Sequence, residues 1–118
     1  MYIWRVENED KCGCYSIHDI ELEDMYIKHS IDYEKYPRPK EDIGINRDIN
    51  SDEICGFKTQ EQALNWFDEE DLKLLSELGF TLKKVYVDKI TAIGEKQVLA
   101  IRQKTSLSNL PEYLYKKI

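Results

Sequence analysis

The chain has 118 residues, of which 42% are hydrophobic and 34% charged, and its formal net charge is −6. This length and apolar content predict one domain over residues 1–118 with its own core. No apolar run is long enough to span a bilayer, and the N-terminus lacks a basic segment followed by an apolar one. We therefore expect a cytoplasmic protein without a membrane anchor. The odd count of three cysteines favours reduced thiols.

The first half of the chain predicts a strand, a short helix and a long loop. Residues 2–7, YIWRVE, alternate in the period of a strand, and residues 14–17 predict a short second strand after a turn at Gly13. Residues 21–30 predict a short helix in spite of their dense acids. Residues 36–53 predict a loop, since their two prolines favour extended conformations in the residues before them.

The clearest helical segment covers residues 59–78. Thr59 is a good N-cap, with Gln62 placed to complete a capping box. Asp68 resembles a second N-cap, and Gly79 suits the left-handed position that ends a helix. These signals predict two helices, or one helix bent at Asp68.

Strands return after the helices. Residues 80–90 predict one strand, and a further strand pair is expected around Gly94, in which residues 98–101, VLAI, form a central strand buried on both faces. Residues 109–118 predict a short closing helix. The expected class is α+β, with a small mixed or antiparallel sheet packed against two central helices and a short C-terminal helix.

The charge is concentrated near the N-terminus. Residues 7–24 hold one lysine and seven acids, so this run alone accounts for the net charge of −6. Such a run disfavours direct binding of nucleic acid and favours a basic partner surface. Three following tyrosines add typical interface anchors. The predicted partner-binding residues are Glu7, Glu9, Asp10, Asp19, Glu21, Glu23, Asp24, Tyr26, Tyr33 and Tyr36. The expected partner is a protein or ribonucleoprotein, and the chain itself is expected to be a monomer or weak homodimer.

Residues 55–67, CGFKTQEQALNWF, admit two interpretations. In the first, Gly56 permits a turn, Thr59 caps a helix, and Trp66 and Phe67 belong to the core. In the second, backbone donors at the junction of a strand and a helix hold an anion. One glycine is a weak signal for the second, so ordinary packing is favoured.

Three segments together resemble the ADP-ribosyltransferase fold: YIWRVE, CGFKTQEQALNWF and GEKQVLAIR. The resemblance implies an NAD site with Arg5, Gly56 and Thr59 as binding residues, and with Glu95 or Gln97 at the catalytic position. If Gln97 occupies that position, the family's glutamate is missing, and a neutral amide cannot stabilise an oxocarbenium-like transition state by charge.

The whole pattern, beginning with YIWRVE, also resembles small phage-encoded proteins of unknown role. Two functions follow. The favoured one is an acidic binding protein without a cofactor that inhibits or modulates a basic-surfaced host macromolecule, as anti-defence and anti-CRISPR proteins do. The alternative is an NAD-binding enzyme of the ADP-ribosyltransferase type or its degenerate descendant. Binding is favoured because the catalytic set is incomplete.

The cysteines and histidines are candidate metal ligands. Cys12, Cys14 and His18 lie close in sequence, and Cys55 or His29 would have to complete the set. The spacing is CxC, whereas structural zinc sites usually contain a CxxC knuckle. We therefore predict no metal and place both histidines on the surface.

Overall fold

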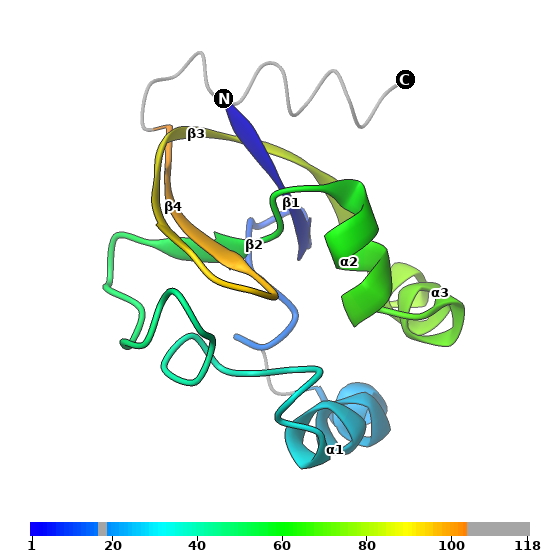
Figure 1. Cartoon of the computed structure of the whole chain (residues 1–118). Coiled ribbons are helices and arrows are strands. Elements are labelled where there is room, and N and C mark those ends of the chain that lie inside the picture. The colour runs from blue at the N-terminus through cyan, green and yellow to red at the C-terminus, as the bar shows by residue number, and fades with distance from the viewer. Residues whose placement is uncertain (17–18, 104–118) are drawn as a thin grey trace.

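The structure is a computed structural model that describes residues 1–16 and 19–103 (Figure 1). In chain order its elements are β1 (Tyr2–Glu7), the 3-10 helix η1 (Ile20–Leu22), α1 (Glu23–Ile31), β2 (Ile54–Gly56), α2 (Gln60–Trp66), α3 (Glu69–Glu77), β3 (Thr81–Ile93) and β4 (Val98–Arg102). A sheet and separate helices share one chain without a regular βαβ repeat, which confirms the predicted α+β class.

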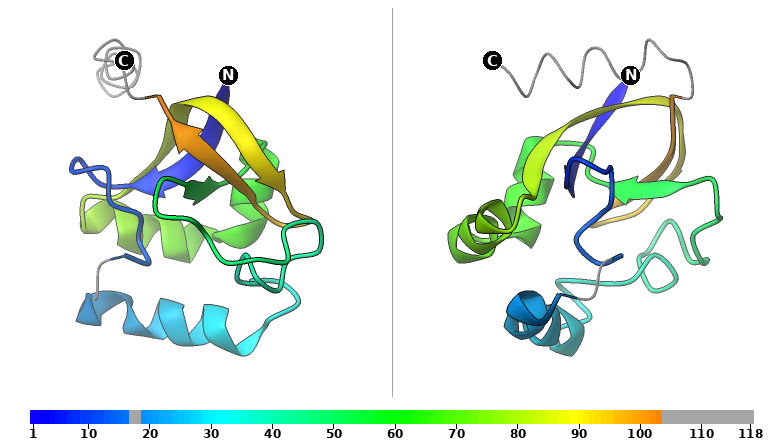
Figure 2. Two further views of the ribbon diagram at one scale, coloured as in Figure 1. Left: turned by 90° about the vertical axis from the view of Figure 1, so that its left-hand side faces the viewer. Right: turned by 180° about the vertical axis from the view of Figure 1, so that it is seen from behind.

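The four strands form one antiparallel sheet in the order β1-β3-β4-β2. β4 lies between β3 and β2, and its Val98, Leu99 and Ala100 are fully buried, so the predicted central strand is confirmed. β3 is a single strand of 13 residues with two shifts of register against β4. Such irregularities bend a strand, and β3 curls visibly around the sheet (Figures 1 and 2).

The curl brings the end of β2 back to β1. Trp4 and Phe57 exchange two backbone hydrogen bonds, each 2.7 Å long. A Cβ atom at Gly56 would lie only 2.6 Å from the carbonyl oxygen of Trp4. Gly56 is therefore needed for close approach of two strands, and the turn predicted at this position is wrong.

Two apolar clusters stabilise this arrangement. One belongs to the sheet and contains Ile3, Val85, Val87, Val98 and Ala100. The other joins β1, η1, α1 and the two central helices, and its buried members include Val6, Leu22, Met25, Phe57, Trp66, Phe67, Leu75 and Phe80. The second cluster thus connects the helices to the sheet.

The helix ends follow the sequence signals with one difference. Thr59 Oγ1 accepts from the backbone N–H of Gln62 at 3.1 Å, but Gln62 Oε1 accepts from the N–H of Lys58 rather than closing a box on Thr59. The complete capping box lies at α3, where Asp68 and Asp71 each accept from the other's backbone N–H. Gly79 ends α3 at φ 88°, as predicted.

The long loop is confirmed, since residues 32–53 contain no helix or strand. Asp42 fixes it to the turn between β3 and β4, because its carboxylate accepts from the backbone N–H of Glu95 at 2.6 Å and of Lys96 and Gln97 at 3.1 Å. A Cβ atom at Gly94 would lie 2.5 Å from this carboxylate. A glycine is therefore required opposite Asp42.

One predicted strand is not formed as expected, and one predicted helix lies outside the residues that the structure describes. Gly13 forms one isolated bridge with Glu7, and residues 14–16 are turn and bend, so the second strand predicted from residue 14 is wrong over this part. The predicted closing helix at residues 109–118 lies outside the described residues. None of the helices in the described ranges is both long and apolar enough to cross a bilayer.

Candidate functional site

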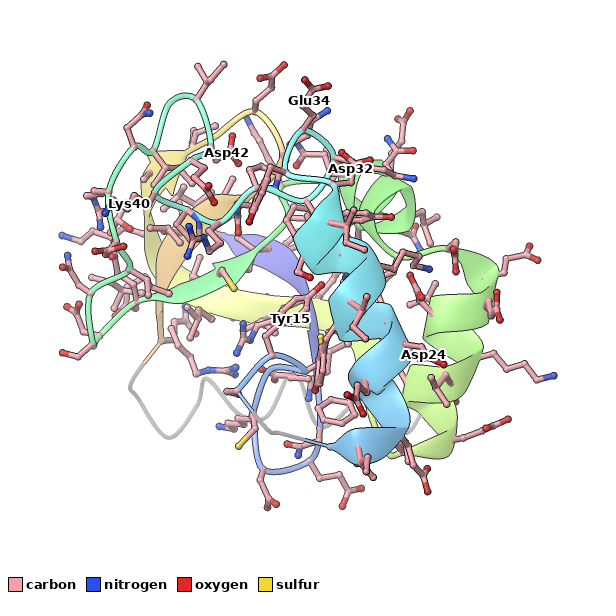
Figure 3. All side chains as sticks on the ribbon, turned by 90° about the horizontal axis from the view of Figure 1, so that it is seen from below. Tyr15, Asp24, Asp32, Glu34, Lys40 and Asp42 are labelled. Atoms are coloured by element: carbon pink, nitrogen blue, oxygen red, sulfur yellow. The ribbon has the colours of Figure 1, made fainter. Side chains whose placement is uncertain are left out.

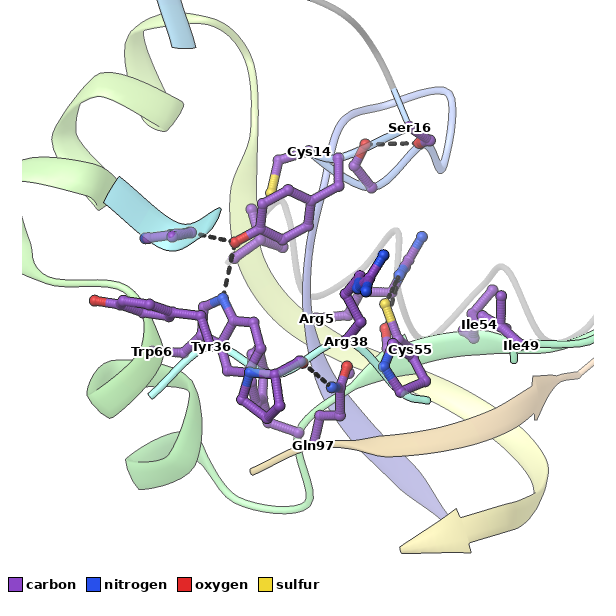
Figure 4. A pocket seen from close by; sticks show the side chains of 18 of the residues that line it. Arg5, Cys14, Ser16, Tyr36, Arg38, Ile49, Ile54, Cys55, Trp66 and Gln97 are labelled. Carbon is purple, nitrogen blue, oxygen red and sulfur yellow. Dashed lines mark hydrogen bonds between the residues drawn. The ribbon is translucent and has the colours of Figure 1, made fainter. Parts of the chain in front are cut away.

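A pocket of about 870 Å³ lies between α1, the long loop and the curled sheet (Figure 4). Aromatic side chains dominate its wall, and they come from segments far apart in the sequence. They are Tyr15, Tyr26, Tyr33, Tyr36, Phe57, Trp66 and Phe67. Polar and charged side chains enter at a few points, notably Arg5, His29, Arg38, Glu53 and Gln97. A large apolar cavity with few polar groups is the usual form of a small-molecule site.

Arg5 belongs to a buried cluster of charges under one end of the pocket. Its Nε lies 3.0 Å from Glu7 Oε2, and Lys83 Nζ lies 3.1 Å from Glu7 Oε1. Arg102 also pairs with Glu7 Oε2. Burial raises the pKa of Glu7, but the charges of Arg102, Lys83 and Arg5 outweigh it and hold that pKa below its usual 4.5. Glu7 is therefore held in its charged form at this end of the pocket, in contact with three cations.

The guanidinium of Arg5 is held in place by the backbone. Arg5 Nη1 donates to the carbonyl oxygen of Cys55 at 2.7 Å. A Cβ atom at Gly13 would lie 2.8 Å from Arg5 Nη2. The lack of a side chain at Gly13 therefore gives Arg5 its position, and only 11% of the Arg5 side chain is exposed.

Gln97 enters the pocket beside the loop. Its Nε2 donates to the carbonyl oxygen of Pro37 at 2.6 Å, and the residue is only 5% exposed (Figure 4). The amide thereby attaches the long loop to the turn that precedes β4. Because Nε2 faces Pro37, the carbonyl oxygen Oε1 is turned to the other side.

A chain of hydrogen bonds crosses the pocket wall at His29. Trp66 Nε1 donates to the hydroxyl of Tyr15 at 2.8 Å, and that hydroxyl in turn contacts His29 Nδ1. His29 Nε2 lies 3.1 Å from Asp71 Oδ2. Burial lowers the pKa of His29 below its ordinary 6.5, and Asp71 offsets this only in part. A neutral ring suits the chain, with Nε2–H donating to Asp71 and Nδ1 accepting from Tyr15.

This chain of bonds is built to position side chains, and it leaves no free base. Both nitrogens of His29 are engaged, and burial raises the pKa of the Tyr15 hydroxyl. A hydroxyl with a raised pKa is a poor nucleophile. The bonds instead fix α1 against α3 and orient the ring of Tyr15 along the pocket, although 48% of that residue remains exposed.

The cysteines do not assemble a metal centre. Cys14 is buried, and burial raises the pKa of its thiol to about 12. Cys55 is half-buried and lies beside Arg5, with its Sγ 3.8 Å from Nη1. Within residues 1–16 and 19–103, no three histidine, cysteine or acidic side chains are grouped to hold a metal ion. His18, one of the ligands considered, lies outside these residues.

The structure brings together some of the residues that the ADP-ribosyltransferase resemblance implied. Arg5, Gly56 and Gln97 all line the large pocket. Thr59 does not line it and caps α2 instead. Glu95 is exposed and lines a separate hollow of about 330 Å³. The implied binding and catalytic residues therefore do not form one complete set.

The predicted acidic surface loses two of its members. Glu7 is fully buried and neutralised by the protein's own cations, and Tyr36 is 8% exposed because its ring stacks on His29. Asp19 is half-buried and caps η1. The other predicted acids are exposed: Glu9, Asp10, Glu21, Glu23 and Asp24. Tyr33 is exposed and Tyr26 half-buried, and both line the pocket.

His29 and Asp42 are the important residues that the sequence interpretation missed. His29 is 4% exposed, so its predicted surface position is wrong. The helical period carried a signal, because His29 lies one turn after Met25, which is also buried. Asp42 had no signal, since its partners follow Gly94 in a different part of the chain.

Comparison with known proteins places the chain in a family. The family model of the bacteriophage T4 Y00F protein matches residues 1–111, which include every strand and helix described above. No curated protein and no solved structure matches the chain, so the resemblance to ADP-ribosyltransferases gains no support from comparison. With nearly its full length matched, from β1 through β4, the chain belongs to the bacteriophage T4 Y00F protein family.

Proposed function

We propose that this phage protein is a binding protein that inhibits or modulates a basic-surfaced macromolecule in the host cytoplasm, in the manner of anti-defence and anti-CRISPR proteins. The observation that carries the proposal is a set of exposed carboxylates on η1, α1 and α3, which we call the acidic helix face: Glu21, Glu23, Asp24, Glu69, Glu70 and Glu77. The partner would be a protein or ribonucleoprotein, bound by a monomer or weak homodimer.

The two main helices of this face are fastened to each other. Lys28 on α1 donates to Asp68 at 2.9 Å and to Asp71 at 2.7 Å. Figures 2 and 3 show α1 and α3 running side by side, with Asp24 labelled on α1. Lys28 thus pairs with acids outside the acidic helix face, whose six exposed carboxylates outnumber the one other lysine on these helices, Lys73.

The face suits a positively charged partner for an electrostatic reason. Its carboxylates are exposed, so they keep their hydration until a complementary surface approaches. Opposite potentials steer the encounter and make association depend on salt. The exposed Glu9 and Asp10, which precede η1 in the chain, add charge of the same sign.

The experiment is a pull-down from host lysate with mass spectrometry, repeated with two triple variants. The first, Glu21→Lys, Glu23→Lys and Asp24→Lys, reverses the α1 part of the acidic helix face. The second, Asp48→Lys, Asp52→Lys and Asp88→Lys, makes the same change of net charge at exposed acids outside it. The proposal expects a partner that the first variant loses and the second retains.

Titration of that partner at several salt concentrations then sharpens the result. Wild type should bind more weakly as salt rises, and the first variant should bind weakly with a flatter salt dependence. Equal affinity of wild type and the first variant would show that the acidic helix face is only a solvated surface.

A second candidate is NAD binding, favoured by one observation: Arg5, Gly56 and Gln97 line the same pocket. Thr59 and Glu95 lie elsewhere and Gln97 carries no charge, so the arrangement favours a degenerate descendant over an active transferase. Isothermal titration with NAD tests it, since a bound ligand must also stabilise the fold. Arg5→Ala should then abolish binding. If turnover occurs, Gln97→Ala should affect it separately from binding.

A further inference from the structure

We propose that the large pocket binds a small aromatic anion of mononucleotide size, with its anionic group at Arg5 and its ring between the exposed tyrosines. The proposal shares its pocket with the second candidate above but needs neither NAD nor catalysis. It is independent of the acidic helix face.

Two polar atoms at the pocket lack a partner in the described part of the chain. Arg5 uses Nε for Glu7 and Nη1 for Cys55, and Nη2 makes no hydrogen bond there. Gln97 uses Nε2 for Pro37, and Oε1 is left without a donor. Gln97 is only 5% exposed, and both residues line the cavity. Unpaired polar groups in such positions indicate a ligand that supplies their bonds.

The guanidinium of Arg5 sets the sign of the ligand. Its Nη2 has no hydrogen-bond partner in the described residues, and a guanidinium nitrogen is a strong donor to phosphate or carboxylate oxygens. Arg38, which is largely exposed, adds a second cation to the lining.

The walls set the shape of the ligand. Tyr15 and Tyr33 are 48% and 59% exposed, and Ile49 is 44% exposed, yet all three line this pocket. Large apolar side chains that remain exposed around one cavity mark a binding surface. Tyrosine rings stack on the planar rings of nucleobases, whatever the identity of the base. Gln97 Oε1 can accept from the exocyclic amine of a base such as adenine.

Isothermal titration and thermal shift with adenosine monophosphate provide the direct test. Two partial ligands separate the contributions: adenosine lacks the anion, and ribose 5-phosphate lacks the ring. We expect one saturable site for adenosine monophosphate and at least about tenfold weaker binding of either partial ligand. Absence of heat and of thermal shift at millimolar adenosine monophosphate would overturn the proposal. So would adenosine that binds as tightly as its monophosphate.

Variants then locate the site. Arg5→Lys keeps the charge that faces Glu7 but removes Nη2, and Gly13→Ala pushes a methyl group against that nitrogen. Both should weaken binding by about tenfold or more, the usual worth of a charge-assisted hydrogen bond. If either fails to fold, the exposed Arg38→Gln and Tyr33→Ala replace them.

Each exposed variant has a matched control nearby. Lys40→Gln removes a cation from the same loop as Arg38, and Ile31→Ala removes an exposed apolar side chain near Tyr33; neither control residue lines the pocket. Arg38→Gln and Tyr33→Ala should weaken binding while the controls leave it unchanged. Unaltered affinity in both pocket variants would overturn the proposal, since the nucleotide would then bind elsewhere.

The same titrations separate this site from the other proposals. Binding of adenosine monophosphate without binding of NAD supports the aromatic anion and removes the dinucleotide candidate. Binding of NAD alone, with no response to the mononucleotide, overturns the inference. The charge-reversed variant of the acidic helix face should lose its macromolecular partner and still bind the nucleotide.

Discussion

The curled sheet and the segment that covers its pocket, residues 19–53, which we call the cap, are held by different forces. The sheet has continuous backbone pairing and a fully buried apolar interior around Ile3, Val85 and Val98. The cap contains the short helices η1 and α1, whose buried residues are Leu22, Met25 and His29, while Ile27 and Ile31 remain 49% and 72% exposed. Fewer apolar side chains are buried along its length than in the sheet.

Polar anchors add to the apolar contacts of the cap. Asp42 binds the β3–β4 turn, His29 binds Asp71, and Pro37 accepts from Gln97. Glu53 closes the loop through two bonds of 2.8 Å from Arg47 and a contact with Thr91. Hydrogen bonds and charges depend on pH and on single side chains, whereas apolar packing is spread over many residues. The cap should therefore be released more easily than the sheet unfolds.

The largest effect on stability is expected at Glu7, a charged side chain that is buried in the sheet. Glu7→Gln leaves Arg5, Lys83 and Arg102 buried without their carboxylate, and removal of one partner of a buried ion pair costs about 3–5 kcal/mol. Urea denaturation should show this loss in one transition. Glu9→Gln, at an exposed neighbour, should change the free energy of unfolding by less than about 0.5 kcal/mol. Equal stability of both variants would contradict the role of the cluster.

Asp42→Ala should release the cap while the sheet stays folded. Three backbone donors lose their acceptor, at a cost of about 1–3 kcal/mol for a buried unsatisfied group. Hydrogen exchange should show faster exchange in α1 while β3 and β4 keep their protection. Glu41→Ala, one position earlier and exposed, is the control. Loss of protection in cap and sheet to the same degree would show that the two regions unfold together.

Glu53 gives the cap a dependence on acid. The hydrogen bonds from Arg47 lower the pKa of Glu53 from 4.5 to about 2, against the opposing effect of burial. Its stabilisation is therefore complete above pH 4.5 and is lost as the pH falls toward 2. Between pH 5 and 3 the Tm of wild type should fall by a few degrees more than that of Glu53→Gln. Parallel curves of Tm against pH for wild type and variant would exclude this contribution. The effect of Glu7 is the same in both proteins and cancels in the comparison.

The smallest effect on stability is expected at His29, and it occurs closer to neutral pH. Its pKa is lowered by burial, so the unfolded state binds more protons near pH 6 and stability falls as the pH drops through 6.5. His29→Gln should flatten the fall in Tm between pH 7.5 and 5.5, because the group whose pKa is lowered by burial is then absent. A flat wild-type curve would show that His29 stays equally protonated in both states.

Local interactions made much of the fold predictable from sequence. Thr59, Asp68 and Gly79 act within one helical turn of their partners, and the strand at residues 2–7 follows from alternation alone. Even the burial of Glu7 has a signal in that alternation, because Glu7 lies on the same side of β1 as the buried Ile3. Because Glu7 is charged, it was expected on the surface in spite of this pattern.

Taken alone, the sequence determined the three main helices, the first strand, the central strand, the α+β class and the sign of the net charge, because each depends on neighbours or on composition. Only the tertiary structure decided which acids are exposed, where the pocket lies and which side chains line it. Glu7 meets Arg102 across 95 positions, and Gln97 meets Pro37 across 60. Such contacts arise from the curl of β3 and the path of the long loop, and no local pattern encodes them.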